Sequence, residues 1–116
     1  MKIVNLKEGN RAIVKGAIVQ IFETKIFNNG NLVLSGVIDD GTGYIRFLAT
    51  NLAVSEIVGI EFKEIVKKYS NLNYEEFLEN IDILGIEYIL AGEVKRNKIG
   101  ELEFIINQSE KSEKEF

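Results

Sequence analysis

The apolar residues of this chain change their spacing twice, and the order of the resulting segments limits the folds open to it. Five runs rich in Ile, Val and Phe, with partial alternation of apolar and polar residues, predict β-strands. Three runs come before residue 50 and two come after residue 86. The predicted strands span residues 11–27, 32–38, 44–49, 87–95 and 102–107.

The segment between the third and fourth predicted strands has helical periodicity instead. Residues 51–58 and 61–69 predict two short helices. Residues 73–84 predict an amphipathic helix, with Asn73 as its N-cap and Gly85 as its left-handed stop. The apolar stripe of this helix consists of Tyr74, Phe77, Leu78, Ile81 and Leu84. We expect the stripe to be buried, with the helix closing one end of the strands.

This order of elements, three strands followed by a helical connection and two more strands, is that of the OB-fold. The OB-fold is a mainly β, five-stranded Greek-key barrel. Gly16 and Gly36 fit this fold, because a long strand that serves both sheets of a small barrel bends sharply and glycine within a strand marks such a bend. A chain of 116 residues is long enough for one domain and too short for two. We predict an OB-fold domain over residues 1–109 and a charged, disordered tail over residues 110–116.

Two absent residue types limit the chemistry that the chain can carry. It has no Cys and no His, so it lacks a thiolate nucleophile, an imidazole base and the ligands of most zinc sites. Triad hydrolases, zinc enzymes and cysteine-dependent redox enzymes are excluded, and we expect no enzymatic activity, no metal and no other cofactor. No apolar run reaches the length of about 18 residues that spans a membrane, and no signal peptide is visible. We expect a cytoplasmic protein with no membrane partner.

The net charge of −4 does not exclude nucleic acid as a ligand, because the acidic residues are clustered. Residues 61–82 contain six acidic and three basic residues, and residues 110–116 contain three acidic and two basic ones. The remainder of the chain, which includes the five predicted strands, is therefore neutral. We expect a neutral barrel to limit the affinity for DNA without preventing binding.

The turn after the second predicted strand carries a short motif. Residues 37–46 have the sequence Val-Ile-Asp-Asp-Gly-Thr-Gly-Tyr-Ile-Arg, and residues 84–88 have the sequence Leu-Gly-Ile-Glu-Tyr, followed by Gly92-Glu93-Val94. These segments resemble the OB domains of replication protein A, in which an apolar strand leads into Asp-Asp-Gly-Thr-Gly and the fourth strand carries Gly-x-Val. The resemblance covers roughly residues 12–110 and is greatest to the C-terminal OB domain of the archaeal large subunit.

The resemblance implies a module that binds single-stranded DNA in replication or repair, with other replication protein A subunits or OB modules as partners. Many members of the family carry a Cys-rich zinc hairpin between the first two strands, whereas this chain has only residues 27–31 there and no Cys. The missing zinc hairpin and the excess of acidic over basic residues leave an alternative open. It is an OB module that binds partner proteins and makes little or no DNA contact.

The third predicted strand supplies the first candidate DNA contacts. Alternation directs Ile45 and Phe47 toward the core and Tyr44 and Arg46 outward. The outer face of strands two and three binds ligands in OB-folds, and an aromatic ring beside a cation can stack a base and neutralise a phosphate. We predict DNA contacts from Tyr44 and Arg46. A solvated strand face with an incidental Arg is the alternative.

The two loops that flank this face carry further candidates. Lys95, Arg96 and Lys98 are three cations within four residues before the fifth predicted strand, and Lys25 and Phe27 stand where the other loop begins. We predict that the cations meet phosphates and that Phe27 stacks a base. The alternatives are a charged hairpin tip that only confers solubility and a Phe27 that closes the end of the barrel.

Overall fold

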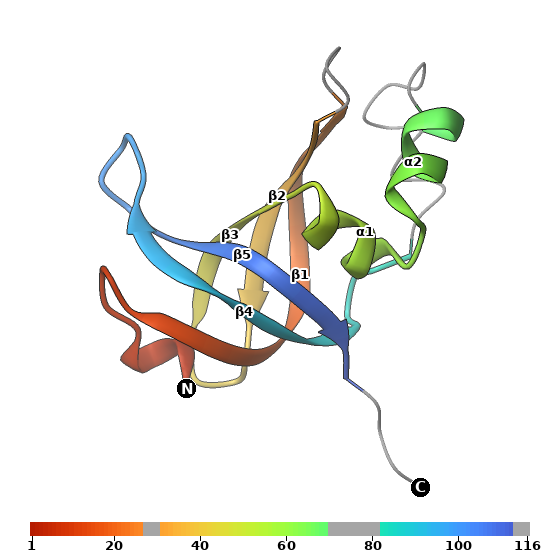
Figure 1. Ribbon diagram of the computed structural model, residues 1–116. Coiled ribbons are helices and arrows are strands. Elements are labelled where there is room, and N and C mark those ends of the chain that lie inside the picture. The colour runs from red at the N-terminus through yellow and green to blue at the C-terminus, as the bar shows by residue number, and fades with distance from the viewer. Residues whose placement is uncertain (27–30, 70–81, 113–116) are drawn as a thin grey trace, which may run out of the picture.

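The computed structural model of the protein describes residues 1–26, 31–69 and 82–112. Within them, five strands close into a barrel (Figure 1). The elements in chain order are η1 (Ile3–Asn5), β1 (Arg11–Ile26), β2 (Leu32–Asp39), β3 (Tyr44–Thr50), α1 (Leu52–Val58), α2 (Phe62–Tyr69), β4 (Glu87–Arg96) and β5 (Leu102–Lys111). The predicted five-stranded barrel with a helical connection between the third and fourth strands is confirmed.

Neighbouring strands pair in the order β1-β2-β3-β5-β4, and β4 pairs with β1 to close the barrel. The pairings are antiparallel except for that of β3 with β5, which is parallel and needs the crossover that α1, α2 and β4 supply. β5 continues to Lys111, and the Ser112 N–H donates to the Glu87 carbonyl at 2.9 Å. Strand pairing therefore runs past residue 109, where we expected the domain to end; residues 113–116 lie outside the described residues.

Alternation along β2 and β3 fills the barrel. Leu34, Ile38 and Phe47 are fully buried, and each lies between more exposed neighbours. α1 follows β3 and buries Ala53, Val54 and Ile57. The Tyr88 hydroxyl donates to the Ile57 carbonyl at 2.9 Å, which ties α1 to β4. The short helix therefore covers the end of the barrel at which β3 finishes.

The N-terminal segment covers the end at which β3 begins. Its Ile3 and Leu6 side chains belong to the core, and the Ile3 N–H donates to Asp40 Oδ2 at 2.7 Å. Desolvation acts to raise the pKa of Asp40, but hydrogen bonds from the Thr42 hydroxyl and from the Ile3 N–H outweigh it and lower this pKa. The carboxylate thus fixes the segment to the turn between β2 and β3.

β1 is bulged where it pairs with β2. The register slips between Ile18 and Gln20 and again between Ile21 and Glu23, so Val19 and Phe22 are the extra residues of the two bulges. A Cβ atom on Gly36 of β2 would lie 2.0 Å from the Gln20 carbonyl oxygen. Glycine is therefore required for β2 to approach the bulged strand. Gly36, which we expected to mark a bend, lies opposite these bulges.

The helix predicted over residues 73–84 requires a correction at its end. Residues 82–84 are not helical, and Leu84 is 55% exposed although we expected it in the buried stripe. Ile83 is buried instead, because Gly85 turns the chain with φ +78° and donates its N–H to the Ile18 carbonyl. The predicted left-handed conformation of Gly85 is confirmed. The rest of the stripe and the Asn73 N-cap lie outside the described residues.

Candidate nucleic-acid interface

The outer face of β2 and β3 is the surface on which the sequence predicted ligand contacts. We call it the β2–β3 face, and its outward side chains are Val33, Ser35, Val37, Asp39, Tyr44, Arg46, Leu48 and Thr50. Tyr44 is 76% exposed, whereas Ile45 and Phe47 are buried. The alternation predicted for β3 is confirmed, and the Tyr44 ring is presented to solvent.

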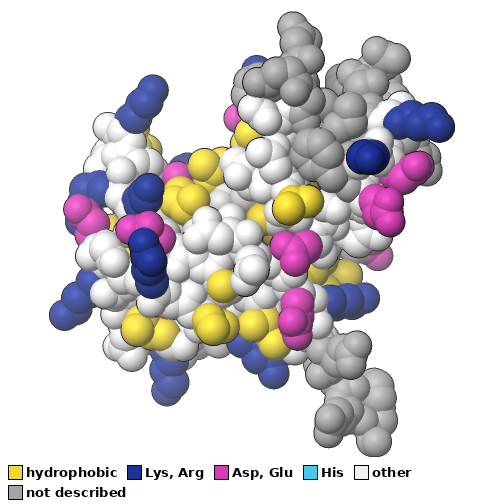
Figure 2. Space-filling view, in the orientation of Figure 1, with side chains coloured by type: hydrophobic (Ala, Val, Ile, Leu, Met, Phe, Trp, Pro, Cys, Tyr) yellow, Lys and Arg dark blue, Asp and Glu magenta, His cyan; other side chains and the backbone are white. Residues whose placement is uncertain are grey.

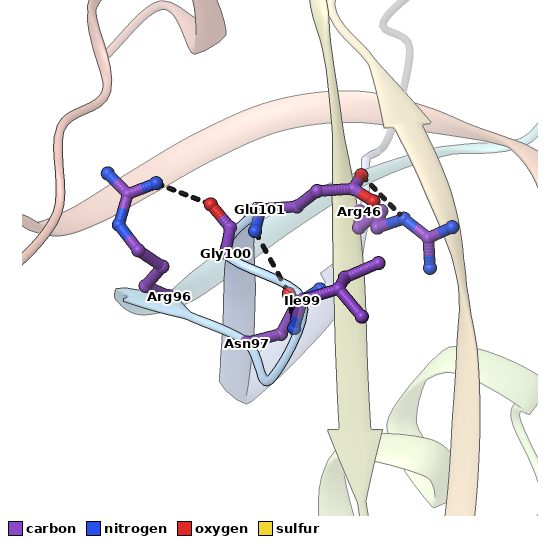
Figure 3. A network of polar contacts seen from close by, with 6 residues as sticks. All are labelled: Arg46, Arg96, Asn97, Ile99, Gly100 and Glu101. Atoms are coloured by element: carbon purple, nitrogen blue, oxygen red, sulfur yellow. Dashed lines mark hydrogen bonds and ion pairs between the residues drawn. The ribbon is translucent and has the colours of Figure 1, made fainter.

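Arg46 lies at the centre of this face between an aromatic ring and a carboxylate. Its guanidinium carbon lies 4.7 Å from the centroid of the Phe22 ring, a cation–π contact. Its Nε donates to Glu101 Oε2 at 3.1 Å (Figure 3). The side chain is 38% exposed. The guanidinium is thus supported on one ring and paired with one anion, and remains accessible to a ligand.

Phe22 was not among the predicted contact residues. It is 38% exposed and comes from β1, at the second bulge. Simple alternation does not place it, because each bulge inserts one residue and changes which side chains face outward. The signal that could have found it is Gly36, since glycine within a strand accompanies bulges and close backbone approach.

A cleft of about 520 Å³ adjoins this face at the start of β3. We call it the β3 cleft, and it is lined by Ile3, Val4, Leu6, Gly43, Tyr44, Ile45, Arg46, Glu101 and Leu102. The Val4 N–H donates to the Thr42 hydroxyl at 3.3 Å, and the Ile3 N–H bonds Asp40. One wall is therefore held in place by the turn between β2 and β3, and Tyr44 and Arg46 belong to both the cleft and the face.

The loop between β4 and β5, residues 97–101, separates the predicted cations into two groups. Arg96 Nε pairs with Glu8 Oε1 at 2.7 Å, and its Nη1 donates to the Gly100 carbonyl. Figure 3 shows Arg96 and Arg46 directed to different sides of this loop. Arg96 therefore contacts the N-terminal segment and is not brought together with Arg46.

The other predicted cations lie around the rim of the face. Lys95 is exposed and stands opposite Glu103 in the sheet register, and Glu103 is in turn opposite Arg46. Lys98 is exposed on the loop, and Lys25 is exposed on β1 opposite Val33. Figure 2 shows basic side chains gathered at the end of the barrel that carries the β4–β5 loop, with acidic ones among them. Phe27 lies outside the described residues.

No protein-family profile and no curated protein matches this chain. Solved structures match its fold. The second OB-fold domain of replication protein A from Methanococcus maripaludis matches with a TM-score of 0.59 and 19% identity, over 100% of this chain and 97% of that one. The SSB domain of a Synechococcus protein matches with a TM-score of 0.54 and 14% identity, over 91% and 99% of the two chains.

The chain has the OB-fold. A replication protein A heterotrimer bound to single-stranded DNA also matches, with a TM-score of 0.66 and 12% identity, over 93% of this chain and 33% of that one. At such identities the likeness establishes the fold alone. Tyr44 and Arg46 lie on the β2–β3 face of this OB-fold, and Phe22 of β1 contacts Arg46 there.

Across residues 1–26, 31–69 and 82–112, no three Asp or Glu side chains lie close enough together to hold a metal ion. Asp39 and Asp40 instead accept hydrogen bonds from the turn that contains them, at the N–H groups of Gly41 and Thr42. None of the described helices is long and apolar enough to cross a membrane.

Proposed function

We propose that this OB-fold domain binds single-stranded DNA along the β2–β3 face, largely without regard to sequence and without catalysis. The observation that carries the proposal is the arrangement of Phe22, Arg46 and Tyr44. Two exposed aromatic rings lie on one face, and between them a guanidinium is stacked on the first ring. Tyr44 and Arg46 are two residues apart on one strand, so both point outward.

This arrangement suits unpaired bases. Every base has an aromatic face, and stacking on a protein ring contributes about 1–3 kcal/mol per base whatever the base is. In a duplex those faces are covered by neighbouring base pairs, so exposed Phe22 and Tyr44 rings favour single strands. Stacking involves no hydrogen bonds to base edges, so we expect little sequence preference.

Phosphates would meet the cations around the rings. Arg46 lies between the rings, and Lys25, Lys95 and Lys98 are exposed on the neighbouring strands and loop. Each phosphate that is neutralised releases counterions, so binding weakens with salt by a slope of about 0.7 per contact for single strands. Because the barrel is close to neutral, we expect an isolated domain to bind weakly, with a Kd on the order of 10⁻⁶ M or weaker.

The likeness to replication protein A domains supports a role in DNA replication, and we propose that the role extends to repair. We propose that the domain acts in the cytoplasm beside other OB modules or replication protein A-type subunits. Several linked modules would raise the affinity through their effective concentration.

A fluorescence anisotropy titration with labelled oligo-dT tests the proposal. We expect saturable binding at low salt that falls as salt is raised, and weaker binding to a duplex of the same length. The Tyr44→Ala variant should bind less tightly than the Tyr44→Phe variant, which keeps an aromatic ring. No binding of the wild-type protein at low salt would contradict the proposal.

A second candidate function is binding of a partner protein. The observation in its favour is a cleft of about 570 Å³ over β1 and β4, with Ile13 62% exposed at its edge. Co-purification of a subunit that Ile13→Asp abolishes and Arg46→Ala leaves intact would support this function.

A further inference from the structure

We propose that Glu101 competes with DNA phosphate for Arg46. In the free protein the Glu101 carboxylate is paired with the Arg46 guanidinium, and a DNA phosphate replaces the carboxylate when a strand binds. This inference rests on the proposed function and adds to it the residue that sets the affinity of its central phosphate site.

The ion pair is placed where a ligand can replace it. Arg46 Nε and Glu101 Oε2 are 3.1 Å apart, and the two side chains are 38% and 51% exposed. An ion pair this exposed is weak, because water screens both charges. A phosphate oxygen accepts the same charge-assisted hydrogen bond from a guanidinium and brings a stacked base with it. Exchange of the carboxylate for the phosphate is therefore favourable.

The Phe22 ring keeps Arg46 on the face during such an exchange. The guanidinium lies 4.7 Å from the ring centroid, a contact that does not involve Glu101. Loss of the carboxylate would leave the cation stacked and available. The ring thus positions Arg46, and Glu101 neutralises it.

The β4–β5 loop holds Glu101 in place. Asn97 Oδ1 accepts the N–H groups of Ile99 at 3.1 Å and of Glu101 at 3.0 Å (Figure 3). The Asn97 N–H donates to the Glu101 carbonyl at 2.8 Å, which closes the hairpin. The backbone of Glu101 is therefore fixed by the loop itself, and its carboxylate meets Arg46 from 55 residues further along the chain.

The same loop supplies a matched control. On its other side, Arg96 Nε pairs with Glu8 Oε1 at 2.7 Å, with side chains 51% and 56% exposed. Glu8→Gln and Glu101→Gln remove the same charge from two exposed Arg–Glu pairs, of which the Arg96–Glu8 pair is the more exposed. They differ in whether the arginine lies on the β2–β3 face.

The experiment is a double-mutant cycle between Arg46→Ala and Glu101→Gln, read by anisotropy with labelled oligo-dT at several salt concentrations. We expect Glu101→Gln to tighten binding about fivefold and to steepen the salt dependence by up to about 0.7. Glu8→Gln should change affinity less than twofold. Glu101→Gln in the Arg46→Ala background should also change it less than twofold.

Three results would overturn the inference alone. Weaker or unchanged binding by Glu101→Gln would mean that the carboxylate positions Arg46 or has no effect on it. An equal gain in the Arg46→Ala background, or with Glu8→Gln, would mean that only net charge matters. In all three cases the proposed function would stand if the wild-type protein binds DNA and Arg46→Ala weakens that binding. Absence of binding by both wild type and Glu101→Gln would instead overturn both proposals. Thermal unfolding by circular dichroism checks that each variant is folded.

Discussion

Two clefts on this barrel are similar in volume and differ in chemistry. The β3 cleft measures about 520 Å³, and the cleft over β1 and β4, which we call the β1–β4 cleft, measures about 570 Å³. The second cleft is lined by Met1, Arg11, Ala12, Ile13, Ala91, Gly92, Asn107 and Gln108. Each contains one arginine, and both have exposed apolar side chains: Val4 at 63% in the first cleft, and Met1 at 61% and Ile13 at 62% in the second.

The two clefts differ in their aromatic rings. The β3 cleft includes Tyr44, and its Arg46 is stacked on Phe22. The lining of the β1–β4 cleft contains no ring. In Figure 2 hydrophobic side chains follow the lower edge of the barrel, over the first half of β1. Both surfaces have a hollow of similar size, and the aromatic rings distinguish the one for which we propose nucleic acid as the ligand.

Gly36→Ala should have the largest effect of the substitutions considered, and its effect is on stability. It acts on the bulges that place Phe22 beside Arg46. The added Cβ atom would lie 2.0 Å from the Gln20 carbonyl oxygen, which forces β1 and β2 apart. We expect the free energy of unfolding in urea to fall by about 3 kcal/mol or folding to fail. Gly43→Ala is the control, since its nearest atom would be 3.7 Å away. Equal stability of the two variants would show that the close approach is not required.

Phe22→Ala should weaken oligo-dT binding about tenfold, within the range of about 1–3 kcal/mol for one stacked base. It removes one stacking ring and the support of Arg46. Ile13→Ala, an exposed truncation on the same strand at the β1–β4 cleft, should leave binding unchanged in the same anisotropy assay. If both truncations weaken binding equally, the two clefts do not differ as described.

Arg46→Ala should weaken binding about fivefold and lower the salt slope by about 0.7, the value for one phosphate contact on a single strand. Arg11→Ala removes the same charge from the β1–β4 cleft and should change affinity less than twofold. An equal loss of affinity for both variants would indicate that DNA binding depends only on the net charge of the protein.

Arg96→Ala should have the smallest effect on DNA, less than twofold. Its guanidinium is engaged by Glu8 and by the Gly100 carbonyl, on the other side of the β4–β5 loop. Removing this exposed pair should lower the free energy of unfolding by at most about 1 kcal/mol. A loss of affinity as large as that caused by Arg46→Ala would indicate that the bound strand also contacts Arg96, on the other side of the loop.

Prediction from the sequence was most accurate where local spacing decides the outcome. The order of strands and helices and the outward direction of Tyr44 and Arg46 follow from periodicity over a few residues, and the structure bears them out. Leu84 was placed wrongly, because a turn at Gly85 and contact with β1 replace the expected end of the helix. Local spacing does not report such contacts.

The amino-acid sequence by itself determined the barrel, its neutral charge and the residues of β3 that face outward. Each of these depends on composition or on neighbours within a few positions. Only the tertiary structure decided which groups share a site with Arg46. Phe22 reaches it through bulges in the β1–β2 register, and Glu101 through a pairing across 55 residues. Arg96 is turned to Glu8, 88 residues away. Strand register and loop packing bring together residues whose proximity the spacing along the chain does not encode.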